Sequence, residues 1–368
     1  MTFCEFLSKI DRPIRKSLVS SFPFLACFVY SNGRKFFLKK LIEERPEQVE
    51  LPAELAREFW GIKFRSPLFN AAGMFKDGKG YELAGLQGAG AFLAGTVTPE
   101  PRKGNACKGV RHPFLPFPLS VSSSNWMGLP NPGLKAVLNV LKTIEKKPGV
   151  PLGLSLASDS DSLSDLETFV RALYRVEDSN IDFIEINESC PNVQHSGRDY
   201  SSLDEKFVAR MEYIAKNFLR QSKRNLPVIV KLSNDFAIEF VPNLIDLLLE
   251  LGYDGLNFGN TSTNYKEISV LINPAEKNAY DFFVSNFGGG VSGIPLKNRS
   301  YALTEAAGKY LRTKSLRGEF HIIRTGGITS YKDIQQSQSV GVSLFQWFTG
   351  YFAYFEKFGH RLYKEFFI

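Results

Sequence analysis

The fold is decided by short apolar stretches, of which 181–187 (IDFIEIN), 227–232 (PVIVKL) and 254–260 (DGLNFGN) are the clearest. They are short and rich in β-branched or aromatic residues, which is typical of strands buried on both faces. Five more stretches of this kind are 67–72, 90–97, 151–157, 320–325 and 342–347. Helix-length amphipathic stretches lie between most of them, such as 164–177, 204–222, 236–251 and 300–316. This alternation favours a parallel sheet, and eight strands are the number that a (β/α)₈ barrel requires.

An open doubly wound sheet is the alternative, but no GxGxxG motif follows the first expected strand and opens a helix. We therefore predict an α/β protein with a (β/α)₈ TIM barrel over residues 61–368. A polar linker over 46–60 is expected to precede it, and a small helical extension over 1–45 to precede the linker. The segments 98–150 and 261–299 are too long for plain connections, and long barrel loops usually build the active site.

Composition excludes several classes of protein. The chain has 368 residues, a formal charge of +7 and four cysteines without a CxxC pair. Widely spaced cysteines argue against a disulfide framework and for a reducing compartment. The four histidines are scattered, so we expect no metal site. No nucleic-acid motif is visible, and the basic balance favours a membrane surface or an anionic ligand.

The N-terminal segment is apolar but short. Residues 19–30 (VSSFPFLACFVY) are interrupted by Pro23, and a membrane-spanning helix needs about 20 apolar residues. Lys and Arg flank this run on both sides, which is typical of helices that lie on a membrane surface. We predict two such helices and a peripheral protein on the cytoplasmic side of the inner membrane. The alternative is a helical hairpin packed on the barrel of a cytoplasmic protein.

Polar side chains recur where the expected strands end. Asn187 ends the fourth strand and Cys190 follows it, while Asn260 ends the sixth. Asn125 and Asn131 lie in the loop after the second strand. In a barrel these positions meet at one mouth. Amides offer donors and acceptors together, so they suit a planar pyrimidine-type ring, and a lysine suits a carboxylate on it. Alone, each of these residues would be read as a turn residue or inert packing.

Glycines cluster late in the chain. Gly288–Gly290 and Gly293 lie in the segment 261–299, and Gly326-Gly327 and Thr349-Gly350 lie in the loops after the seventh and eighth expected strands. Barrels often bind phosphate at these loops, because glycine lets backbone N–H groups approach an anion closely. Ordinary turn glycines are the alternative. A phosphate-bearing cofactor such as flavin mononucleotide (FMN) fits such a site.

Taken together, these stretches resemble the dihydroorotate dehydrogenases from about residue 60 onward. The resemblance rests on motifs that occur in the family's order, and none of them suffices alone. They are NAAGMFKDG (70–78), GTVTPEPRKGN (95–105), NWMGLPNPG (125–133), NESCPNV (187–193), VKL (230–232), GNTST (259–263), GGGVSG (288–293), RTGGITS (324–330) and LFQWFTG (344–350). The segment RPIRKSLVSSFPF also resembles the helical extension of the membrane-associated class.

The resemblance implies oxidation of dihydroorotate to orotate in pyrimidine (UMP) biosynthesis, with FMN as cofactor and Cys190 as the catalytic base. It places the substrate on Lys76, Asn125, Met127, Gly128, Leu129, Asn187, Asn192, Asn260 and Thr261. It places FMN on Ala72, Gly73, Thr96, Ser155, Asn187, Lys231, Gly293, Gly327, Phe348 and Thr349.

The chain departs from the family's pattern at several positions. Cys190 and NWMGLPN resemble the class that uses soluble acceptors, whereas Lys76 and the N-terminal extension resemble the class that uses a membrane quinone. Ser155, Gly259 and Phe348 stand where the family has Asn, Thr and Tyr. We expect a quinone acceptor, since the extension has no obvious purpose in a soluble enzyme. The alternatives are fumarate or a similar acceptor, a related flavin barrel acting on another pyrimidine, and an inactive binding homologue.

Overall fold

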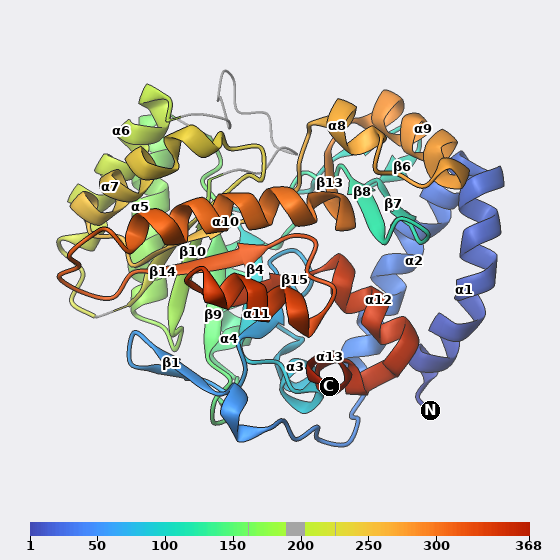
Figure 1. The fold of residues 1–368 in the computed structure, drawn as a ribbon, viewed down its shortest axis with the longest axis horizontal. Helices are drawn as coiled ribbons and strands as arrows, with labels where there is room; N and C mark the ends of the chain where they lie inside the picture. Colours follow the sequence, from blue (N-terminus) through green and yellow to red (C-terminus); the bar gives the residue numbers. More distant parts are fainter. Residues whose placement is uncertain (161, 189–202, 225) are drawn as a thin grey trace.

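The computed structural model describes residues 1–160, 162–188, 203–224 and 226–368. Its centre is a sheet of eight parallel strands in the spatial order β3-β15-β14-β12-β11-β10-β9-β4, which curls into a barrel (Figure 1). The strands are β3 (Leu68–Asn70), β4 (Phe92–Val97), β9 (Leu152–Leu156), β10 (Phe183–Asn187), β11 (Val228–Leu232), β12 (Gly255–Phe258), β14 (His321–Thr325) and β15 (Val342–Trp347). Each lies inside one of the eight predicted stretches, so the barrel prediction is confirmed.

The barrel closes between β3 and β4 through few contacts. The Asn70 side chain takes the place of a strand partner: its Nδ2 donates to Leu93 O at 2.8 Å and its Oδ1 accepts from Leu93 N at 3.2 Å. Backbone bonds from Gly73 N to Gly95 O and from Gly90 N to Leu68 O flank this contact. A short first strand is therefore sufficient, because a buried amide satisfies the backbone groups of its neighbour.

The interior of the barrel toward the amino-terminal ends of its strands is apolar. Phe69, Leu93, Phe183, Ile229, Ile323 and Leu344 pack together there with Phe64 and Ala91. A hairpin of β1 (Arg57–Phe59) and β2 (Ile62–Phe64) packs against this cluster, and the indole of Trp60 donates to Asp254 O at 3.1 Å. Burial of these large side chains stabilises the barrel, because each contributes roughly 1.5–3 kcal/mol.

Helices cover the outside of the barrel. They are α3 (Tyr81–Gln87), α4 (Leu134–Leu141), α5 (Leu163–Glu177), α6 (Glu205–Ile214), α7 (Val241–Leu251), α10 (Lys297–Leu311), α11 (Tyr331–Ser339), α12 (Thr349–Phe358) and α13 (Leu362–Phe367). The predicted helix over 204–222 is α6 followed by a π-helical turn, η2 (Ala215–Leu219), and the one over 236–251 begins with a 3₁₀ turn, η3 (Ile238–Phe240). Short 3₁₀ turns are η1 (Ala53–Leu55) and η6 (Gly359–Arg361).

The two long segments form a second layer above the strand ends. It consists of the sheet β7 (Phe114–Phe117), β8 (Ser122–Asn125) and β13 (Gly290–Gly293), with α8 (Tyr265–Ser269) and α9 (Lys277–Phe287) beside it. The hairpin β5 (Ala106–Cys107) and β6 (Val110–Arg111) and the turns η4 (Pro274–Glu276) and η5 (Ile294–Leu296) complete it. Buried Glu276 ties the layer together by accepting hydrogen bonds from Leu119 N and from Ser120 N and Oγ.

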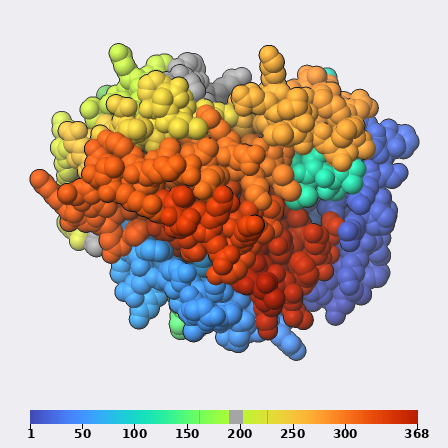
Figure 2. Space-filling model, in the orientation of Figure 1, coloured from blue at the N-terminus to red at the C-terminus, as the bar shows by residue number. Residues whose placement is uncertain are grey.

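The N-terminal extension is two helices, α1 (Phe3–Ser21) and α2 (Pro23–Glu43). They lie along the side of the molecule that carries α12, away from α5, α6 and α7 (Figures 1 and 2). Glu44 anchors them, because it accepts from Cys4 N at 2.7 Å and from Nε2 of His360, also at 2.7 Å. No helix in the described part of the chain is long and apolar enough to cross a membrane.

These helices nevertheless expose an apolar surface. Large apolar side chains that are about half exposed are Phe3, Phe6, Ile10, Ile14, Phe22, Phe24, Leu25, Phe28, Val29 and Phe36. Soluble proteins rarely leave such a set open without a partner. The extension therefore packs on the barrel through one face, as the alternative of a helical hairpin expects, and presents another apolar face outward.

Candidate active site

A cleft opens where the barrel strands end, beneath the second layer. It encloses about 1030 Å³ of space between side chains, including the opening at its mouth. The structure brings most of the predicted site residues into its wall: Ala72, Gly73, Lys76, Thr96, Asn125, Met127, Leu129, Asn187, Lys231, Asn260, Thr261, Gly293, Gly327, Phe348 and Thr349. Residues far apart in the sequence thus converge on one site, as strand ends in a barrel must.

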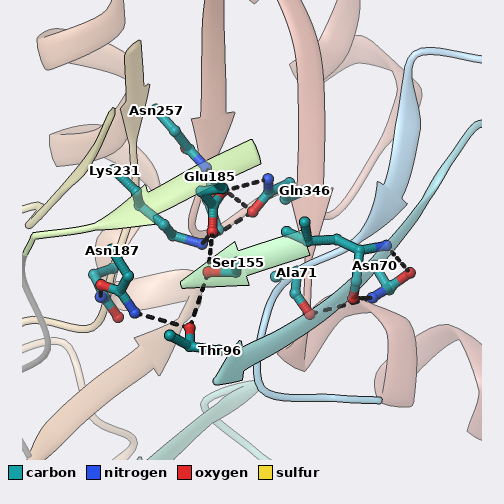
Figure 3. A network of polar contacts seen from close by, with 12 residues as sticks. Asn70, Ala71, Thr96, Ser155, Glu185, Asn187, Lys231, Asn257 and Gln346 are labelled. Atoms are coloured by element: carbon teal, nitrogen blue, oxygen red, sulfur yellow. Dashed lines mark hydrogen bonds and ion pairs between the residues drawn. The ribbon is translucent and has the colours of Figure 1, made fainter. Parts of the chain in front are cut away.

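A polar network forms the floor of this cleft (Figure 3). Glu185 of β10 lies at its centre and is 1% exposed. Its Oε1 accepts from Ser155 Oγ at 3.0 Å and from Lys231 Nζ at 3.3 Å. Its Oε2 accepts from Asn257 Nδ2 at 2.8 Å and from Gln346 Nε2 at 2.7 Å. A buried charge is tolerated only when it is paired and hydrogen-bonded in this way.

Lys231 lies between this floor and the cleft. Its ammonium group also donates to Gln346 Oε1 at 3.0 Å, and its side chain is 4% exposed. Two acceptors from β10 and β15 therefore fix a cation where Lys231 lines the cleft. A fixed cation stabilises negative charge that develops in a bound ring.

The predicted asparagines form a connected row. Asn260 Nδ2 donates to Asn187 Oδ1 at 3.0 Å, and Asn187 Nδ2 donates to Thr96 Oγ1 at 2.9 Å. Thr96 in turn lies 3.0 Å from Ser155 Oγ. The amides of β10 and of the loop after β12 are thereby held in one orientation at the mouth.

The opposite end of the cleft suits a phosphate. Gly327 has a φ of +70°, and a Cβ there would lie 2.4 Å from Lys297 Cα, so only glycine fits this turn. Thr349 and Gly350 begin α12 at the cleft wall, and a helix N-terminus favours an anion. Hydroxyl groups line this end as well, since Ser292 Oγ lies 2.8 Å from Thr349 Oγ1 and 2.9 Å from Ser123 Oγ.

The cleft also contains a buried hydroxyl oxygen that a ligand could contact. Thr261 Oγ1 is shielded from solvent and makes no hydrogen bond within the described residues. Such atoms normally have a partner, which a ligand can supply. The long cleft, its cation, its glycine-lined anion end and this hydroxyl together fit a flavin with one phosphate.

The end of the cleft that Lys76 lines is basic. Lys35 and Arg34 lie near the same loop as His112. The pKa of His112 lies below its ordinary value, because its ring is buried and because Lys35, Lys76 and Arg34 are close. A positive field of this kind favours an anionic ligand.

Some predicted residues lie elsewhere. Gly128 is behind the wall, where a Cβ would lie 2.3 Å from Asn105 Oδ1, and Ser155 lies beneath Thr96. Asn131 is used inside its own loop, where its amide bonds Thr98, Leu129 and Gly133. Cys190 and Asn192 fall outside the described residues, so their predicted roles stay predictions.

The sequence reasoning missed the floor. Glu185, Asn257, Thr325 and Gln346 were not predicted as site residues. A charge inside the apolar stretch IDFIEIN was a usable signal, because an acidic residue in a strand buried on both faces requires partners. Thr325 also explains Gly259: a Cβ at Gly259 would lie 2.0 Å from Thr325 O, so Thr325 occupies the space that a larger residue 259 would need.

A second cavity adjoins the first. It encloses about 2250 Å³, including open space, and lies between α1, α2, α12 and β7. Val121, Ile294, Phe348 and Thr349 line both cavities, so the two meet at the phosphate end of the cleft. Arg34 lies in its wall, and burial lowers the pKa of this guanidinium to about 10.

The fold and the site together indicate the class of protein. It is a (β/α)₈ barrel oxidoreductase whose cleft has an anion-binding end and a basic mouth lined by amide side chains. The chain belongs to the dihydroorotate dehydrogenase family, whose model matches residues 54–365. A curated relative from Akkermansia muciniphila, dihydroorotate dehydrogenase (quinone), is 30% identical over 309 residues, covering 82% of this chain and 81% of its own length. A relative of the same name from Christiangramia forsetii is 29% identical and covers 90% of this chain and 88% of its own.

A solved structure supports the fold. The dihydroorotate dehydrogenase of Eimeria tenella in complex with ferulenol superposes with a TM-score of 0.73 at 21% identity. The match covers 90% of this chain and 88% of that one. It extends beyond the barrel strands to most of the molecule.

Proposed function

We propose that this protein oxidises dihydroorotate to orotate with bound FMN and passes the electrons to a membrane quinone. The observation that carries the proposal is the single cleft that unites Lys76, the asparagine row and Lys231 with a glycine-lined anion end. Membership of the dihydroorotate dehydrogenase family supports the same activity.

In this proposal each group has a defined task. Lys76 pairs with the substrate carboxylate, and Asn125, Asn187 and Asn260 bind the ring amides. The flavin, when bound, supplies the acceptor for the hydride from C6. Cys190, three positions after Asn187, takes the C5 proton on its Sγ; an unperturbed thiol has a pKa of about 8.5, close enough to neutrality for a base. Lys231 offsets the negative charge left on the reduced ring.

Orotate binding tests the substrate assignment. Orotate should perturb the visible spectrum of the purified yellow protein, and mass spectrometry of the released flavin should identify FMN. Lys76→Met should weaken orotate binding by about 10- to 100-fold, because a charge-assisted hydrogen bond contributes roughly 1.5–3 kcal/mol. Lys79→Met is the matched control, since Lys79 is 58% exposed and pairs with Asp77 of its own loop across 3.5 Å. Equal orotate affinity in the two variants would contradict the role of Lys76.

The quinone assignment rests on the second cavity. An apolar path between two surface helices that ends beside the cleft suits a lipid-soluble acceptor, and the curated relatives are named for quinone. The outward apolar face of α1 and α2 suits docking on a membrane surface, where quinone is dissolved.

A cavity-filling variant tests this path. Gly33 lies in the cavity wall, and a Cβ there meets nothing within 4 Å, so the Cβ of Gly33→Phe has room and its ring adds bulk at the cavity wall. It should slow reoxidation by a quinone analogue at least about fivefold and leave reduction by dihydroorotate unchanged. Gly318→Phe is the control, because Gly318 is equally open and lies outside both cavities. Rapid reoxidation by fumarate instead of quinone would favour a soluble acceptor.

A further inference from the structure

Glu185 is a buried carboxylate that the proposed reaction does not use. It lies between Ile184 and Ile186 in a strand whose residues are all buried. Removing one partner of such a buried ionic group costs roughly 3–5 kcal/mol, and apolar residues of similar volume often replace the whole group without loss. Its place directly beneath the cleft therefore calls for an explanation beyond stability.

The four partners of Glu185 fix its state. Ser155, Lys231, Asn257 and Gln346 all bring donors to it, two to each oxygen. Gln346 cannot turn its amide over, because its Oε1 already accepts from the ammonium group of Lys231 at 3.0 Å. Asn257 is held in the same way by Thr325, which donates to its Oδ1 at 2.9 Å. Among the described residues these partners of the Glu185 carboxylate all donate to it, so it acts as an ionised acceptor, and Lys231 balances its charge.

The number of available hydroxyl hydrogens also fixes the donor-to-acceptor direction of the hydrogen bonds along the asparagine row. The one hydroxyl hydrogen of Ser155 goes to Glu185, so Thr96 must donate to Ser155. Thr96 Oγ1 then accepts from Asn187 Nδ2, which leaves Asn187 Oδ1 to accept from Asn260 Nδ2. Asn260 Oδ1 accepts from the backbone N–H of Thr261 at 2.9 Å. Every donor in this chain thus points toward Glu185 (Figure 3 shows the part from Asn187 to Glu185).

We propose that Glu185 is a positioning residue that sets both ends of the site: it holds Lys231 at the flavin ring and orients the Asn187 and Asn260 amides toward the substrate. This inference rests on the proposed function. The negative charge of Glu185 counteracts Lys231 and thereby lowers the midpoint potential of the flavin. The hydrogen-bond chain through Ser155 and Thr96 decides which amide atoms meet the substrate ring.

The flavin potential tests the first half. Glu185→Gln keeps the shape and removes the charge, so the anionic reduced flavin is stabilised. The midpoint potential should rise by at least about 30 mV, which is a tenfold change in the equilibrium constant of a two-electron couple. Glu276→Gln is the matched control, because Glu276 is also 1% exposed but bonds Leu119 and Ser120 in the second layer. Its potential should equal that of the wild type.

Orotate affinity tests the second half. Ser155→Ala cuts the chain between Glu185 and Thr96 but leaves the Lys231 pair in place. It should weaken orotate binding about 2- to 10-fold, the value of one hydrogen bond, while the flavin potential stays unchanged. Glu185→Gln should weaken orotate binding at least as much and also shift the potential. A structural role alone would not separate these two readouts.

The results of these experiments distinguish a failure of this inference from a failure of the proposed function. If the wild-type protein holds no flavin or dihydroorotate does not bleach it, the proposed function fails before any variant is measured. If the wild type reacts but Glu185→Gln retains its potential and its orotate affinity, the inference alone is wrong. Should Glu185→Gln fail to hold flavin, Glu185→Asp decides the first half: it keeps the charge and must keep the wild-type potential. An unchanged orotate affinity in Ser155→Ala would overturn the second half.

Discussion

Replacing Gly259 by alanine tests how tightly the floor of the cleft is built. Gly259 has a φ of +152°, and an added Cβ would lie 2.0 Å from Thr325 O and 2.2 Å from Thr325 Cβ. The strained backbone costs about 1–2 kcal/mol and the collision about 1–3 kcal/mol. Displaced Thr325 also loses the hydrogen bond that its one hydroxyl hydrogen makes to Asn257 Oδ1 at 2.9 Å, which contributes about 1 kcal/mol. We expect a total loss of about 3–6 kcal/mol and weaker flavin binding.

Gly252→Ala provides the matched control for this prediction. Gly252 ends α7 with a φ of +86°, but a Cβ there meets nothing within 4 Å, so only the backbone strain of about 1–2 kcal/mol applies. The assay is urea unfolding of the flavin-loaded protein, followed by far-UV circular dichroism and by flavin fluorescence. The reasoning is refuted if the two variants unfold within about 0.5 kcal/mol of each other, a difference that surface changes also produce.

Three further predictions concern single residues. Burial raises the pKa of Asp254 to about 6 in the folded protein, so its contribution to stability is present below about pH 4 and is lost as pH rises through 6. Asp254→Asn should therefore be more stable than the wild type at pH 7.5, by up to about 2 kcal/mol, with no gain at pH 4 in thermal unfolding. Glu44→Ala removes the acceptor for Cys4 and His360, and proteolysis within residues 1–45 should become at least about tenfold faster with the barrel intact. Cys190→Ala should retain FMN but slow flavin reduction by dihydroorotate at least about 10²-fold in stopped flow, and near-wild-type reduction would exclude Cys190 as the base.

The barrel was predictable because its signals are local. Each strand is a short apolar run, and runs such as PVIVKL need no knowledge of their neighbours to be recognised. The wall of the cleft was predictable for a related reason: strand ends in a parallel barrel meet by topology, so Asn187, Lys231 and Asn260 had to converge.

The floor and the docking of the extension depend on pairings that no local pattern encodes. Gln346 meets Glu185 from a strand 161 residues away, and the inward direction of both side chains is set by barrel geometry. His360 meets Glu44 across 316 residues of sequence, and this contact places α1 and α2 beside α12. The sequence favoured helices on a membrane surface over a hairpin packed on the barrel, although amphipathic patterns are compatible with both.

The central claim is that one cleft oxidises dihydroorotate and hands the electrons to quinone through the helix-lined cavity. Its most direct test is an anaerobic titration of the purified yellow protein with dihydroorotate, followed by addition of a quinone analogue, fumarate or NAD in separate samples. The account predicts bleaching with one orotate formed per flavin, then rapid recovery of colour with the quinone analogue only. A flavin that stays oxidised in the presence of dihydroorotate would contradict the account.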